Sequence, residues 1–172
     1  GRMYVTTGNG AGESFQADDR SKSILQIDPE TLADRAKTSF PAEAENWDTD
    51  DLDLGSSRVI PLPGTPYLVA GSKFGDMFVL ERESMRLITR FQAAGRLSGG
   101  FDWTGIYNGF AAWRDLVFVW PGGGGSSDDD PDASFGRDVL RSYRISLDGG
   151  ITLISLGSSD GAMAGYQGAG LA

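Results

Sequence analysis

The chain of 172 residues contains neither cysteine nor histidine. Without thiols or imidazoles it cannot form disulfides, zinc-finger sites, cysteine-linked haem sites or histidine-based catalytic triads. Any chemistry must therefore use carboxylates, amides, hydroxyls, lysine or arginine. The lack of cysteine does not by itself indicate a redox compartment.

Long apolar runs and basic residues are also scarce. No apolar stretch approaches the roughly 18 residues that cross a bilayer, so we expect no membrane insertion. The chain has 15 basic and 24 acidic residues and a net charge of −9. Such a surface repels phosphate backbones, so we expect no nucleic-acid partner. The sequence opens without an initiator Met or a signal peptide, and we expect it to be a piece of a longer protein or a processed chain.

What the sequence does contain is a series of short apolar segments separated by Gly, Pro, Asp and Ser. No useful window shows a helical period, and the pattern predicts an all-β protein. The order strand, strand, turn, strand occurs three times. The predicted strands are 3–8, 24–27 and 35–40 in the first unit, 67–71, 77–80 and 87–91 in the second, and 116–120, 139–145 and 151–156 in the third. Further strand candidates are 58–62, 109–112 and 169–172.

Meander units that recur at this spacing are typical of β-propeller blades. A β-sandwich is the alternative, although it does not require a repeated strand order. We predict a partial propeller of about three to four blades, in units of about 1–57, 58–108 and 109–172 of a single domain. Three blades cannot close a ring, and open blades expose sheet edges and apolar faces. The remaining blades should come from further sequence or from a partner chain.

Five segments resemble a known family in their order along the chain. They read "MYVTTGNG", "SILQIDPETL", "DDLDLGSSRVIPLP", "YLVAGSKFGDMFVLERESM", and "DLVFVWPG" followed by "LRSYRIS". They resemble quinoprotein-type β-propellers, which comprise the pyrroloquinoline quinone (PQQ) alcohol dehydrogenases and the larger group of PQQ-like repeat proteins. The resemblance covers nearly the whole chain and is closest to the repeat group. It implies a periplasmic or extracellular location.

The resemblance implies two candidate calcium ligands. Asn9, in "TTGNG", matches the amide that helps to ligate calcium beside the quinone, and a side-chain carbonyl on a glycine-flanked turn suits this ion. Alternatively, Asn9 simply adopts a left-handed turn conformation. Asp50 matches the first aspartate of the family's Asp-x-Trp-Asp motif, which can bind the metal and take the alcohol proton. The alternative for the cluster of Asp48, Asp50 and Asp51 is a solvated loop.

Two further residues belong to the same comparison. Asp53 matches the second aspartate of that motif, Leu52 replaces its tryptophan, and we expect Asp53 to orient the turn before strand 58–62. Lys73, in "GSKFG", matches the cation that contacts the quinone, where it would stabilise negative charge on the reduced cofactor. The alternative for Lys73 is a turn residue beside Gly75.

The dehydrogenases' vicinal disulfide cannot form here, and no Cys-x-x-Cys-His haem motif is present. We therefore favour a non-catalytic PQQ-like propeller without a cofactor, acting as a scaffold or binding module for protein partners. The alternative is a calcium- and PQQ-dependent alcohol dehydrogenase that uses Asn9, Asp50 and Lys73. The Gly-, Ser- and Asp-rich insertion at 121–136 is expected to be a flexible surface loop, with weak calcium binding as the alternative.

Overall fold

The computed structural model describes residues 1–8, 20–40, 54–94, 105–107, 110–121, 140–146, 148 and 150–156. This part of the chain contains strands and turns, and among its residues there is no helix long and apolar enough to cross a bilayer. The strands are β1 (Met3–Thr6), β2 (Ser23–Ile27), β3 (Asp34–Ser39), β4 (Val59–Pro61), β5 (Tyr67–Gly71), β6 (Asp76–Glu81), β7 (Leu87–Gln92), β8 (Phe110–Trp113), β9 (Leu116–Val119), β10 (Arg141–Ile145) and β11 (Ile151–Leu156).

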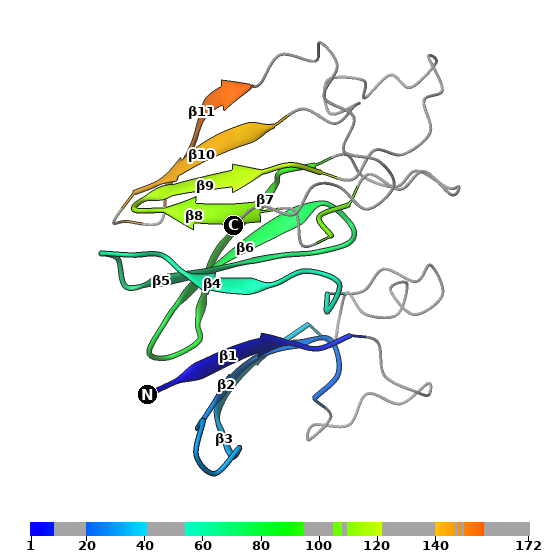
Figure 1. Cartoon of the computed structure of the whole chain (residues 1–172), viewed down its shortest axis with the longest axis vertical. Coiled ribbons are helices and arrows are strands. Elements are labelled where there is room, and N and C mark those ends of the chain that lie inside the picture. The colour runs from blue at the N-terminus through cyan, green and yellow to red at the C-terminus, as the bar shows by residue number, and fades with distance from the viewer. Residues whose placement is uncertain are drawn as a thin grey trace.

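The strands form three separate antiparallel sheets, which follow one another along the long axis of the molecule (Figure 1). The first sheet has the order β1-β2-β3, the second β4-β5-β6-β7 and the third β8-β9-β10-β11. Val5, Val69 and Val117 therefore lie in three successive sheets rather than in one sandwich. This arrangement confirms the all-β meander and the partial propeller, and the sheets do not close into a ring.

The strand candidates at 58–62 and 109–112 are confirmed as β4 and β8, the first strands of the second and third sheets. The candidate at 169–172 lies outside the described residues, as do residues 122–136 of the predicted surface loop. In the first sheet, β1 occupies the place that β5 and β9 have in the other two sheets.

Hydroxyl groups establish which positions of the first two sheets are equivalent. After β1, the Thr7 hydroxyl accepts a hydrogen bond from the Ser23 N–H at 2.9 Å. After β5, the Ser72 hydroxyl accepts one from the Asp76 N–H at 3.1 Å. Thr7 therefore corresponds to Ser72, and the residue that follows each, Gly8 or Lys73, is also equivalent.

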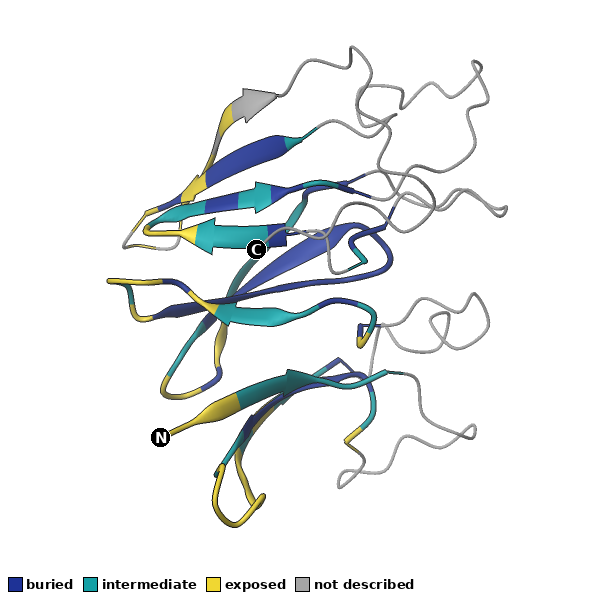
Figure 2. Cartoon of the chain, in the orientation of Figure 1, coloured by how far each residue is buried: buried dark blue, intermediate teal, exposed yellow. Residues whose placement is uncertain are grey.

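Apolar side chains form one core between the first and second sheets and another between the second and third. Successive residues of a strand point to opposite faces, so the middle sheet must be apolar on both. All five residues of β5 are accordingly buried (Figure 2). The first core includes Ile24, Phe40, Leu68, Phe78 and Met85. The second includes Val69, Met77, Val117, Tyr143 and Ile145.

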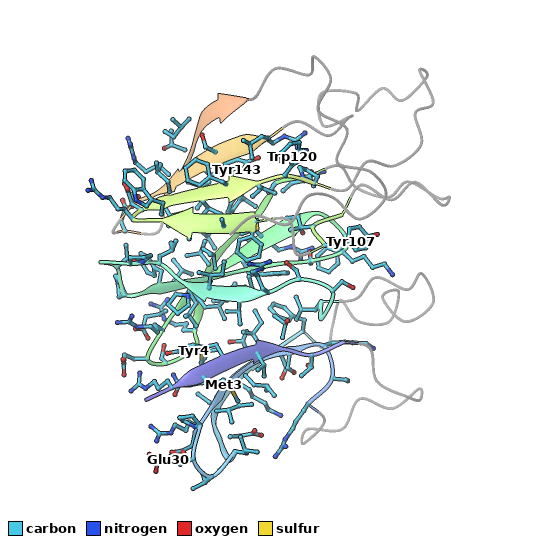
Figure 3. The ribbon with its side chains drawn as sticks, in the orientation of Figure 1. Met3, Tyr4, Glu30, Tyr107, Trp120 and Tyr143 are labelled. Atoms are coloured by element: carbon cyan, nitrogen blue, oxygen red, sulfur yellow. The ribbon has the colours of Figure 1, made fainter. Side chains whose placement is uncertain are left out.

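Connections of different length leave the two ends of the sheets. At one end, which we call the turn end, the connections are residues 28–33, 62–66, 82–86, 114–115 and 146–150. At the opposite end, the loop end, they are 7–22, 40–58, 72–75, 93–109 and 120–140, and four of these five are longer than any at the turn end. Figure 3 shows Glu30 at the turn end and Tyr107 at the loop end.

The same turn joins the last two strands of the first and second sheets. The Asp28 carboxylate accepts hydrogen bonds from the N–H groups of Glu30 and Thr31, at 2.9 and 3.1 Å. An ion pair with Arg35, followed by these two N–H groups, lowers the pKa of Asp28.

In the second sheet, Glu81 takes the place of Asp28 and accepts from the N–H groups of Glu83 and Ser84, at 3.0 and 2.6 Å. Hydrogen bonding to Ser84 and Glu83 lowers the pKa of Glu81. Each turn then passes through a left-handed residue, Leu32 with φ 58° or Met85 with φ 60°. Leu32 and Met85 are therefore equivalent positions.

Candidate functional site

The three residues for which a site was predicted belong to connections at the loop end. Asn9 lies in the connection between β1 and β2, Asp50 in the one between β3 and β4, and Lys73 in the one between β5 and β6. Asn9, Asp50 and the neighbouring Asp53 lie outside the described residues, so their roles remain predictions. Lys73 is described.

Two glycine backbones bring the first two of these connections together. A Cβ atom added to Gly55 would lie only 2.6 Å from the Gly8 nitrogen, so no other residue fits at Gly55 without a shift. Close by, the Thr6 hydroxyl donates to the Ser57 carbonyl at 2.8 Å. Gly8 directly precedes Asn9, and Gly55 follows the aspartate cluster. The structure thus packs residue 55 of the β3–β4 connection on residue 8 of the β1–β2 connection, while Asn9 and Asp50 themselves lie outside the described residues.

The same contact recurs at Lys73. Gly105 packs so closely that an added Cβ would overlap the Lys73 carbonyl, just as Gly55 packs on Gly8. The Lys73 side chain is buried, with 6% of the residue exposed. The left-handed position of its turn is Gly75, with φ 89°, and the equivalent of Lys73 in the first sheet is a glycine. The turn therefore does not require a lysine at position 73.

Buried polar groups near these contacts were not predicted from the sequence. Ser57 and Tyr107 each follow a packed glycine by two residues, and the hydroxyl of each is buried. The Asp76 carboxylate, 1% exposed, forms an ion pair with Arg90. Asp76 resembled an ordinary turn residue because it follows a glycine, and only the packing of the β5–β6 connection reveals its burial.

Arg90 and Asp76 form a structural pair at the edge of the first core. The Arg90 guanidinium lies 5.4 Å from the Phe74 ring centroid and 5.5 Å from that of Phe78. This position between two rings and a carboxylate stabilises the β6–β7 pair. Among the residues that the structure describes, no group of three acidic side chains is placed to hold a metal ion.

The chain matches no known family model and no curated protein in sequence. Among solved structures it is similar to a europium-containing methanol dehydrogenase, with 12% identity and a TM-score of 0.50. The match covers 76% of this chain and 21% of the dehydrogenase, so the chain spans about a fifth of the length of that protein. BamB from Moraxella catarrhalis matches with 11% identity and a TM-score of 0.43, over 80% of this chain and 32% of BamB.

At this level of identity the first similarity concerns the fold alone. It agrees with the three antiparallel sheets, their meander order and the two cores between them. The chain therefore has the PQQ-like, quinoprotein-type β-propeller fold.

Proposed function

We propose that this chain is part of a non-catalytic β-propeller that binds a protein partner through its loop end. The observation that supports this function is the difference between the two ends of the sheets. Short turns close one end, whereas four long connections leave the other. Long connections on a rigid scaffold are where binding surfaces are usually built. As part of the same proposal, the protein acts in the periplasm or outside the cell, without a bound cofactor.

Photo-crosslinking from each end tests the partner proposal. A photoreactive phenylalanine analogue replaces Ser56 at the loop end or, as the matched control, Glu30 at the turn end. In cells that express the complete protein, we expect a discrete crosslinked protein from position 56 and none from position 30. Equal crosslinking from both positions, or no discrete product from position 56, would contradict the proposal.

The burial of Lys73 favours a second candidate function, the calcium- and PQQ-dependent alcohol dehydrogenase. The turn does not require this lysine, since Gly8 occupies the same place in the first sheet. A buried cation at the loop end fits a carboxylate- or quinone-bearing ligand. PQQ, when bound, would act as the oxidant of an alcohol.

In this second candidate function each predicted residue keeps its role. Lys73 would donate a hydrogen bond to an oxygen of the ligand, Asp50 would accept the alcohol proton and bind calcium, and Asn9 would complete the calcium ligands. Titration of the purified protein with PQQ, with and without calcium, followed by dye-linked alcohol oxidation, tests this assignment. Saturable, calcium-dependent binding that Lys73→Ala abolishes would favour the dehydrogenase over the scaffold. Binding unaffected by Lys73→Ala would exclude the role of Lys73.

A further inference from the structure

We draw no further inference here: the strongest candidate, the cluster of acidic side chains in the β3–β4 connection at the loop end, carries nothing because Asp48, Asp50 and Asp51 lie outside the described residues and no second observation points to a ligand there.

Discussion

Arg141 and Tyr143 donate hydrogen bonds to the same backbone carbonyl. Arg141 Nη1 lies 3.1 Å and the Tyr143 hydroxyl 3.4 Å from the Ala93 oxygen. Both residues are buried, 2% and 5% exposed, and the Tyr143 ring centroid lies 4.9 Å from that of Phe91. One carbonyl at the end of the second sheet thus anchors two polar side chains of the third sheet inside an otherwise apolar core.

This anchor predicts a loss of stability at alkaline pH. Burial raises the pKa of Tyr143, and the nearby Arg141 offsets part of this effect. Because the folded-state pKa lies above the unfolded value, the neutral hydroxyl stabilises the fold below about pH 10, and this stability is lost as the pH rises further. The free energy of unfolding, measured by urea titration, should fall more steeply between about pH 9 and 11 in wild type than in Tyr143→Phe. Identical slopes would contradict this assignment.

The close glycine contacts at the loop end predict that a single added methyl group will strongly lower the free energy of unfolding. In Gly105→Ala the new Cβ would overlap the Lys73 carbonyl, and in Gly55→Ala it would lie 2.6 Å from the Gly8 nitrogen. Neither obstacle is a flexible side chain, so we expect each variant to lose about 2–3 kcal/mol of unfolding free energy or more.

Gly64→Ala is the control for these variants. Gly64 has φ 74° but no atom within 4 Å of an added Cβ, so only backbone strain of about 1 kcal/mol should result. Chemical denaturation measures all three variants. A loss for Gly105→Ala no larger than that for Gly64→Ala would show that the two connections are not in contact.

The carboxylates of Asp28 and Glu81 predict that the fold loses stability at acidic pH. The pKa values of Asp28 and Glu81 are lowered by their hydrogen bonds, so the unfolded chain takes up protons at a higher pH than the folded chain. Their contribution is complete above the unfolded pKa of about 4 and is lost as the pH falls through the folded values. The double variant Asp28→Asn and Glu81→Gln keeps a side-chain oxygen as acceptor. The unfolding free energy of this variant should decline less than that of wild type between about pH 5 and 3. An equal decline in the variant and in wild type would show that these turns do not cause the acid sensitivity.

Ser72 is 0% exposed, and removal of its hydroxyl should lower the free energy of unfolding. Removal of the hydroxyl of Thr7, the equivalent residue of the first sheet, should have the same effect. Ser72 Oγ donates to the Asp76 carbonyl at 2.9 Å and accepts from the Asp76 N–H, so Ser72→Ala leaves two buried backbone groups without this partner. We expect a loss of about 1–3 kcal/mol in urea unfolding. Thr7→Ser keeps the hydroxyl of the first sheet and should lose less than Thr7→Val. Equal losses in the two Thr7 variants would contradict the role of the hydroxyl.

The sequence predicted most of the strands because their period and punctuation are local properties. Apolar runs such as Tyr67–Gly71 and the turns that begin at Asp28 and Glu81 need no knowledge of distant residues. The recurring order of these segments predicted a propeller rather than a sandwich. By contrast, the left-handed positions of Lys22, Leu32 and Met85 could not be foreseen, since none of them is a glycine or asparagine.

The candidate site was predicted by resemblance at Asn9, Asp50 and Lys73, and only Lys73 lies within the described residues. Gly105, from the β7–β8 connection, packs on the Lys73 backbone, and neither this contact nor the burial of Lys73 and Asp76 follows from their sequence neighbours. A lysine between Ser72 and Phe74 carries no local signal of burial. The roles of these residues toward a ligand remain predictions.

Strand length, turn chemistry and apolar period are encoded within a few neighbouring residues, so the repeated antiparallel meanders could be predicted from the sequence. Which residues are buried depends in addition on how the sheets pack. Leu32 and Met85 have the same turn and the same backbone conformation, yet one is exposed and the other buried. Burial depends on what packs against a residue in space, and a local sequence pattern does not contain that neighbour.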